Sequence, residues 1–182
     1  GLYVVPVFHR VEIMDVSVKK IQIERQAHEG LICKDNMRAD IKVAFFVRVN
    51  NDVSYIKKVA QTIGVARASR IETLEDLFEA KFSEALKTVG KKFEFIELYE
   101  ARREFRDEIV NIIGTDLNGY TLEDCAIDFL EQTPVQHLKP DNILDAEGIK
   151  KITDLTAAQN IKANLIKRDE EKTIRKQDVE AR

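Results

Sequence analysis

The sequence predicts an α+β protein in which an antiparallel β unit packs with helices and a long C-terminal helix follows. Three observations support this fold class. Every odd position from 39 to 49 is apolar, apolar residues recur at three- and four-residue steps through much of 53–113, and the 34 residues after Gly148 include neither glycine nor proline. The first pattern is the period of a half-buried strand, the second is that of an amphipathic helix, and the third permits one uninterrupted helix.

The strand predicted over 38–49 organises the rest of the fold. Its sequence is RADIKVAFFVRV, and the even positions are charged except at Ala44 and Phe46. We therefore expect a small apolar patch on the side of the strand that should face water. Either a helix of the same chain covers this patch or a partner presses against it, and the small size of the patch favours the intramolecular cover. The face that we predict to be buried consists of Ala39, Ile41, Val43, Phe45, Val47 and Val49.

The remainder of the first fifty residues predicts further short antiparallel strands. Residues 2–8 are typical of an edge strand or of the entry to a strand, because they are mostly apolar but include a proline, which cannot donate to a ladder. The parity of the apolar positions changes near Lys19, which predicts a bulge or a tight break there. Another strand is predicted over 31–34, and the turn-forming pair 35–36 joins it to the central strand. Residues 1–50 should thus form one antiparallel β unit.

Three amphipathic helices are predicted after the central strand. They run over 53–63, 73–89 and 96–113, and a glycine follows each one. Capping side chains precede the first helix, and Thr73 with Asp76 offers a loose capping box for the second. Burying one Phe or Leu side chain on the apolar face of such a helix stabilises the fold by about 1.5–3 kcal/mol. A place in the core therefore explains the aromatic residues of these helices without a ligand.

A late strand is predicted over 120–133, after the turn signal Asn118-Gly119. Apolar and polar side chains alternate along it, with Cys125, Ile127 and Phe129 expected on one face. We expect this strand to return to the sheet of the first fifty residues. A lone strand after three helices would otherwise leave its backbone groups unpaired.

The final segment predicts one long helix with an apolar seam. The seam passes through Ile149, Ile152, Leu155, Ala158, Ile161 and Leu165. Residues 141–182 carry nine basic and nine acidic side chains. A long helix with a thin apolar seam and balanced charge cannot bury itself, so it should pack against neighbouring helices, and copies of itself are the partners we expect. The alternative for residues from Lys167 onward is a frayed, solvated tail.

Composition and charge exclude several classes of protein. Apolar residues at 44% and charged residues at 34% exclude a disordered chain of low hydrophobicity, and no apolar run approaches the ~18 residues that span a bilayer. A net charge of −3 removes the electrostatic support for nucleic-acid binding. The chain begins without an initiator Met or a signal peptide, so we expect a trimmed piece whose upstream part, including a membrane anchor, lies outside it.

The sequence contains no motif that predicts catalysis, and we expect neither a catalytic residue nor a cofactor. The seven glycines form no phosphate-binding loop, and Cys33 and Cys125 are too few for a disulfide framework or a zinc site, so two buried thiols are expected. The three histidines have no cysteine or paired carboxylates nearby, so no metal site is expected. Asp124 and Asp128 would lie about 13 Å apart along a strand, too far to share a proton as an acid–base pair.

The order of elements and several long segments resemble a known family. A β unit, three helices, a returning strand and a long charged helix resemble the SPFH (band 7) domain of stomatins, prohibitins and flotillins. The chain is similar to bacterial flotillin-like inner-membrane proteins in PVFHRVEIMDVSV, GLICKDNMRADIKVAFFVRV, AKFSEALKTVGKKF, LNGYTLEDCAIDFLEQTP and DNILDAEGIKKITDLTAAQN. Together these segments extend over nearly the whole chain.

The resemblance implies a division of the chain and a function. Residues 1–50 would be the β unit of an SPFH domain, 51–134 its helical part with the returning strand, and 135–182 the start of a coiled-coil wall. Proteins of this family are non-enzymatic, membrane-anchored scaffolds that oligomerise into rings or cages and organise membrane microdomains. The alternative, suggested by prohibitin-like relatives, is a regulatory enclosure for a membrane protease or another integral membrane client.

The resemblance also implies partners and a location. We expect copies of the same chain, membrane lipids reached through an anchor outside this fragment, and a small integral membrane protein as partners, and no nucleic acid. The expected location is the cell inner membrane, with this domain on the cytoplasmic side. The candidate oligomer interface combines the apolar patch of the strand with the seam of the long helix, at Phe46, Ile149, Ile152, Leu155, Ile161 and Leu165.

Overall fold

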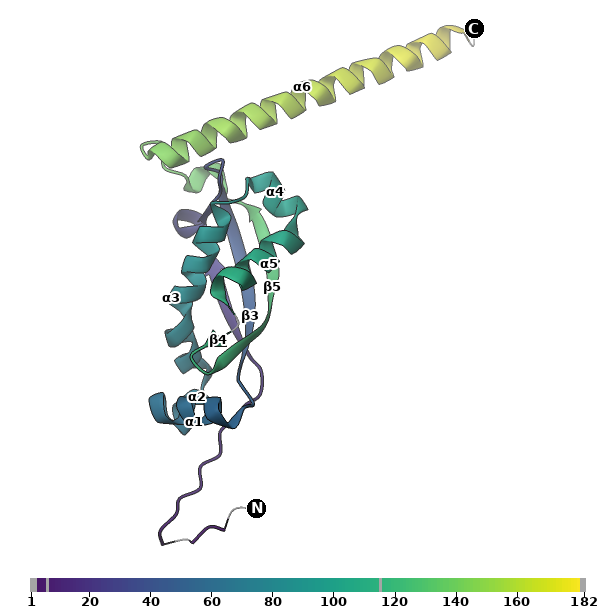
Figure 1. Cartoon of the computed structure of the whole chain (residues 1–182). Helices are drawn as coiled ribbons and strands as arrows, with labels where there is room; N and C mark the ends of the chain where they lie inside the picture. Colours follow the sequence, from purple (N-terminus) through teal and green to yellow (C-terminus); the bar gives the residue numbers. More distant parts are fainter. Residues whose placement is uncertain (1–2, 6, 115, 181–182) are drawn as a thin grey trace.

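The computed structural model describes residues 3–5, 7–114 and 116–180, the last three by their backbone only. Figure 1 shows a sheet with helices along it, two short helices near the end from which the N-terminal segment leaves, and a long helix that projects from the opposite end. The fold is α+β, as predicted. Its elements are β1 (Lys19–Arg25), β2 (Leu31–Ile32), β3 (Arg38–Val49), α1 (Val53–Thr62), α2 (Val65–Ala68), α3 (Ile71–Gly90), α4 (Phe95–Glu100), α5 (Arg102–Ile113), β4 (Asp116–Leu117), β5 (Tyr120–Gln132) and α6 (Ile143–Glu180), with short 3-10 helices at Ala27–Glu29 and Val135–His137.

The sheet is antiparallel and is built around β3. Its strand order is β1-β3-β5-β4, and β2 pairs with the start of β3 on the side of β1. Strand β5 returns to β3, as predicted, and places Cys125 opposite Phe45, while Ile21 of β1 lies opposite Phe45 on the other side. The predicted inward face of β3 is confirmed, because its central side chains are 0% exposed, namely Ile41, Val43, Phe45 and Val47.

Helices α3 and α5 cover this inward face with their apolar stripes. Phe82 of α3 stacks on Phe45 with ring centroids 4.3 Å apart, and Phe78 continues the row to Tyr120, with 5.4 Å between their ring centroids. The Tyr120 hydroxyl donates to the Ala68 carbonyl at 3.3 Å, and burial raises the pKa of Tyr120 to about 12. The aromatic residues of the predicted helix 73–89 are therefore core residues, as expected.

Two features of the helices differ from the prediction. Helix α3 begins two residues before Thr73, which lies buried in the first turn and does not cap it. The capping box lies instead at Glu94 and Glu97, where α4 begins. The single helix predicted over 96–113 is two helices, α4 and α5, separated at Ala101, which has φ −102° and ψ 45°. The spacing of apolar residues continues across Ala101 without a glycine or proline, so periodicity alone did not reveal the break.

The segment before β1 also departs from the prediction. The described residues of 2–8 form no strand, and the Val5 carbonyl accepts hydrogen bonds from the backbone N–H groups of Phe8 and His9. Strand β1 begins at Lys19, where a break was predicted, and Lys19 pairs there with Val47 near the end of β3. Just before this strand the backbone N–H of Ser17 donates to the Asp15 carboxylate at 2.8 Å. Strand β2 is likewise shorter than the predicted strand.

Strand β5 includes a register shift that changes which side chains face the core. Phe129 lies opposite Lys42. Ile127 lies opposite Val43, so Asp128 is an extra residue on β5. A β-bulge of this kind turns the neighbouring side chain to the other face of the sheet. The prediction that Phe129 shares the core face with Ile127 is therefore wrong, and Phe129 lies among the polar side chains of the open face.

Helix α6 confirms the predicted long C-terminal helix. It has 38 residues, a length of about 57 Å, and it begins before Gly148, so that this glycine lies inside its second turn. The Asn142 side chain accepts hydrogen bonds from the backbone N–H groups of Leu144 and Asp145, at 3.0 and 3.3 Å, and caps the helix. The helix continues through Glu180, past the point where the alternative prediction placed a frayed tail.

Candidate oligomerisation surface

An almost buried ion pair fixes the start of α6 to the first residue of β3. The Arg38 guanidinium donates through Nε and Nη2 to Oδ1 of Asp145, at 3.1 and 2.7 Å, and through Nη1 to the His28 carbonyl at 2.8 Å. Only 11% of the Arg38 side chain and 6% of the Asp145 side chain are exposed. Burial acts to raise the pKa of the Asp145 carboxyl, but the backbone N–H of Lys139 and the Arg38 guanidinium outweigh it and hold the pKa below its usual value.

A close backbone contact seats the second turn of α6. A Cβ atom on Gly148 would lie 2.6 Å from the carbonyl oxygen of Asn36, so glycine lets the helix approach the turn between β2 and β3 this closely. Asn36 has φ 60°, a left-handed conformation that Asn tolerates, and its side-chain amide donates to the Glu147 carboxylate. These contacts at the base of α6 therefore fix the direction in which the helix leaves the domain.

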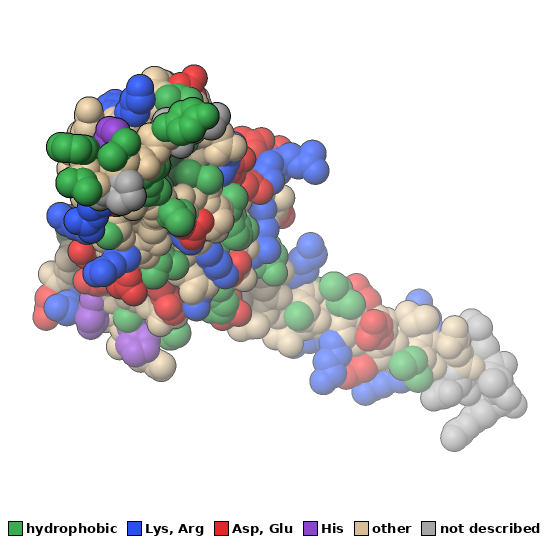
Figure 2. Space-filling model, turned by 90° about the horizontal axis from the view of Figure 1, so that it is seen from below, with side chains coloured by type: hydrophobic (Ala, Val, Ile, Leu, Met, Phe, Trp, Pro, Cys, Tyr) green, Lys and Arg blue, Asp and Glu red, His purple; other side chains and the backbone are tan. Residues whose placement is uncertain are grey.

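Beyond its base, α6 has no cover from its own domain. Every side chain described from Thr156 to Gln177 is exposed. Figure 1 shows this helix projecting past the sheet, and Figure 2 shows apolar side chains between charged ones along it. An isolated polar helix is only marginally stable in water, so we expect neighbouring helices to stabilise it. The large apolar side chains of this stretch are Ile161, Leu165, Ile166 and Ile174, which are 63%, 56%, 53% and 57% exposed.

The predicted seam does not follow one straight line along the helix. Ile149, Ile152 and Leu155 lie at the base and are half-buried, whereas Ile161 and Leu165 lie farther along in the exposed stretch. An α-helix turns by about 100° per residue, so the directions of Ile149 and Ile161 differ by about 120°. The predicted residues of α6 therefore belong to two apolar areas on different sides of one helix.

Phe46 lies far from this helix, on the face of the sheet that α3 and α5 leave open. It is half-buried and lies opposite Lys20 of β1 and Asp124 of β5. Eight residues of strand, about 27 Å, separate it from Arg38 beside α6. Its neighbour Ala44 is 1% exposed. The helix that we expected to cover Ala44 and Phe46 is absent from the described part of the chain, because the helices over the sheet pack on its other face.

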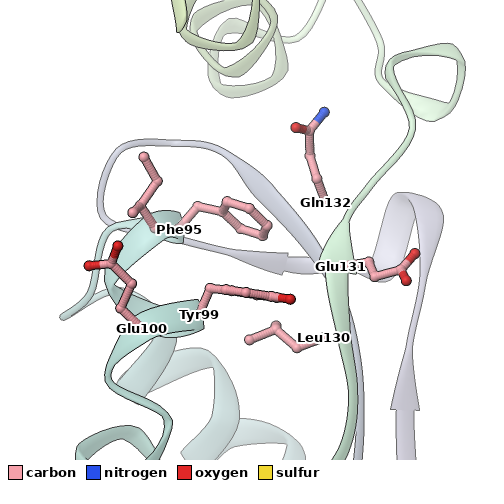
Figure 3. A pocket seen from close by; sticks show the side chains of 7 residues that line it. Phe95, Tyr99, Glu100, Leu130, Glu131 and Gln132 are labelled. Carbon is pink, nitrogen blue, oxygen red and sulfur yellow. The ribbon is translucent and has the colours of Figure 1, made fainter. Parts of the chain in front are cut away.

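An apolar groove that the sequence did not predict lies between α4 and the end of β5. Figure 3 shows the rings of Phe95 and Tyr99 reaching from α4 toward Leu130 on β5. The Arg102 guanidinium lies 5.6 Å from the centre of the Tyr99 ring. The side chains that line the groove come from α4 and β5, which are far apart in the sequence, so no local pattern signals it. It has a volume of about 480 Å³ and is lined by Phe95, Ile96, Tyr99, Glu100, Leu130, Glu131 and Gln132.

The two thiols are buried, as predicted, and are not poised for reaction. Cys33 and Cys125 are 0% and 1% exposed, and both are free. Burial raises the pKa of each thiol to about 12, so both stay protonated at neutral pH. Within the described residues, no three His, Cys, Asp or Glu side chains gather as metal ligands would. No helix described by the structure has the length and apolar character needed to cross a membrane.

The sheet, the helices on one of its faces and the uncovered α6 define an α+β domain with a projecting helix. All 182 residues match the model of the SPFH domain / Band 7 family, and the chain belongs to this family. It is 35% identical over 183 aligned residues to the flotillin family inner membrane protein YqiK of Escherichia coli, covering 100% of this chain and 33% of that protein. It is 30% identical over 158 residues to the flotillin family inner membrane protein sll1021 of Synechocystis sp., covering 85% of this chain and 23% of that protein. The chain thus spans a third or less of the length of these relatives.

Proposed function

We propose that this chain is part of a non-enzymatic, membrane-associated scaffold that oligomerises into rings or cages and organises membrane microdomains. The observation that carries the proposal is the uncovered length of α6, from Thr156 to Gln177, with its exposed apolar side chains. Both relatives are named inner membrane proteins, which supports a place at the inner membrane. The proposal includes a position of this domain on the cytoplasmic side. The partners in this proposal are copies of the chain, membrane lipids and a small integral membrane protein.

The energetics of the exposed side chains favour a closed assembly over a simple pair. Fully burying an Ile or Leu side chain gives about 1.5–3 kcal/mol, so covering the exposed half of one gives about 1 kcal/mol. Four such side chains in one copy give about 4 kcal/mol, which is at the low end of the ~4–15 kcal/mol that association costs in lost translational and rotational freedom. One pair of helices is therefore weak. A ring repeats the contact at every subunit and closes on itself, so weak contacts add up.

Charge substitutions on the exposed helix test this assembly. We expect Ile161→Lys with Leu165→Lys, in the protein expressed from its full gene in membranes, to reduce the particle mass in mild detergent. The reason is that each lysine would be buried against a neighbour without a partner charge. The matched control is Asn160→Lys with Asn164→Lys, which adds the same charge to the polar side of the same turns and should leave the mass unchanged. A parent-like mass for the first variant, with its helix content intact, would contradict the proposal.

A further inference from the structure

A pocket lined by basic side chains lies at the end of the domain from which α6 leaves. It is bordered by the end of β1, the 3-10 helix Ala27–Glu29, β2, the start of β3 and the C-terminal end of α3, and it has a volume of about 290 Å³. The basic residues that line it are Arg25, His28, Arg38, Lys87 and Lys91. They belong to elements that are far apart in the sequence, so the fold is what gathers them around one pocket.

Arg38 shapes this pocket, because most of its hydrogen bonds are already made within the protein. Its guanidinium donates to the Asp145 carboxylate at 2.7 Å, and to the carbonyls of His28 and Gly30 at 2.8 and 3.4 Å. These bonds hold the 3-10 helix against the start of β3. The charge of Arg38 is balanced by Asp145. The remaining basic side chains are therefore the ones open to a ligand.

These remaining side chains carry an excess of positive charge. Lys87 and Lys91 are exposed, and neither forms an ion pair with a carboxylate in the described part of the chain. Like charges four positions apart on a helix repel each other. The Arg25 guanidinium lies 4.0 Å from the carboxylate of Glu29, which is 75% exposed. Three positive charges and this one carboxylate leave the lining with a net charge of +2 when His28 is neutral.

We propose that this pocket binds a phosphate monoester. Such a group carries a charge of about −1.5 to −2 near pH 7 and presents three acceptor oxygens, which matches the net charge and the three cationic donors of the pocket. The end of α3 by itself favours lysines through the helix dipole, but it does not account for Arg25 and His28, which other elements bring to the same pocket. Ile32 adds an apolar side chain to the lining, where a small apolar group next to the phosphate would lie.

Two sources present this chemistry, namely a soluble phosphorylated molecule and the headgroup of phosphatidic acid. The inference does not depend on the assembly proposed above. Titration calorimetry with phenyl phosphate tests it, on the protein expressed from its full gene and purified in mild detergent. We expect saturable, sub-millimolar binding that weakens as salt is added, because salt screens exposed charges. Phenyl sulfate has a similar shape and only one negative charge, so it should bind several-fold more weakly.

Variants assign the binding to these side chains. Lys87→Gln with Lys91→Gln should weaken phenyl phosphate binding about tenfold or more, because two charged donors are lost. The matched control is Lys57→Gln with Lys58→Gln, which removes the same charge from α1 at the other end of the domain and should leave binding unchanged. Glu29→Gln removes the competing carboxylate and should tighten binding several-fold. Damage to the fold would not produce this gain.

A short-chain phosphatidic acid in the same detergent separates the two sources. Binding tighter than that of phenyl phosphate, with the same loss when Lys87 and Lys91 are replaced, would assign the pocket to a lipid headgroup. Equal or weaker binding would assign it to a soluble ligand. The inference is overturned if phenyl phosphate does not bind, if phenyl sulfate binds as tightly, or if the variants of α3 and α1 lose binding alike. In each of these three cases the function proposed above would stand.

Discussion

Replacing Arg38 by Met removes the cation that holds α6 to the sheet and keeps a long apolar side chain in its place. The Arg38→Met substitution deletes two hydrogen bonds to Asp145 and one to the His28 carbonyl. The Asp145 carboxylate then stays almost buried, with the Lys139 N–H as a donor but without its counter-ion. We expect the free energy of unfolding to fall at neutral pH, because an unpaired charge remains out of water.

The burial of this ion pair sets the size of the expected effect. Breaking a buried pair by removing one partner costs about 3–5 kcal/mol. In a domain of this size each kcal/mol lowers the melting temperature by about 2–4 °C, so we expect a decrease of roughly 6–20 °C. The pair between Arg48 and Glu123 serves as a reference, since 29% and 38% of its side chains are exposed. Such pairs contribute only about 0–1 kcal/mol.

Thermal and urea unfolding, followed by circular dichroism, measure the difference. Arg48→Met is the matched control, and it should lower the melting temperature by no more than about 4 °C. Adding Asp145→Leu to Arg38→Met removes both charges and should restore much of the lost stability. If Arg38→Met and Arg48→Met melted within about 2 °C of each other, the reasoning would be refuted, because the pair at the base would then be no stronger than an exposed one.

Three further predictions concern the core, the helix base and pH. Phe45→Asp should unfold or aggregate the domain, because Phe45 is fully buried; a parent-like melting temperature would show that the face assignment is wrong. Gly148→Ala should lower the melting temperature although alanine favours a helix by about 1 kcal/mol, because its Cβ would lie 2.6 Å from the Asn36 carbonyl oxygen. A melting temperature of Gly148→Ala equal to or above that of the parent would show that the turn at Asn36 moves aside. The pKa of Asp145 is lower in the folded state, so its contribution to stability is complete above about pH 4 and is lost as the pH falls through the folded pKa. Asp145→Asn should reduce this acid loss in denaturant titrations, and parallel pH profiles for variant and parent would contradict the assignment.

Regular patterns within one element were predictable from the sequence, whereas irregularities were not. The alternation along β3 identified its buried face, because successive side chains of a strand point to opposite faces of the sheet. The extra residue at Asp128 has no glycine or proline beside it to mark a bulge, so nothing in the sequence separated Phe129 from the core face. The break at Ala101 likewise lacked glycine or proline. In both cases pairing and packing with other elements decided the local structure, and single-segment periodicity does not include those contacts.

The candidate surface was predictable as a set of residues but not as a geometry. The apolar residues of α6 are visible in the sequence, but successive steps of three residues drift by about 60° around a helix, so a seam chosen by such steps winds away from its starting side. The Arg38–Asp145 pair joins residues that are 107 positions apart, which no local pattern predicts. The groove beside Tyr99 is formed by α4 and the end of β5, which only the folded domain brings together.

The length of α6 turns small changes at its base into large displacements at its far end. Over the roughly 57 Å of its 38 residues, a tilt of about 10° moves the distal end by about 10 Å, which is the diameter of a helix. The contact between Gly148 and the Asn36 carbonyl lies at the base of α6, so it helps to set the position of the distal end. Any tilt of α6 at this contact is therefore multiplied along the helix and is largest at its distal end.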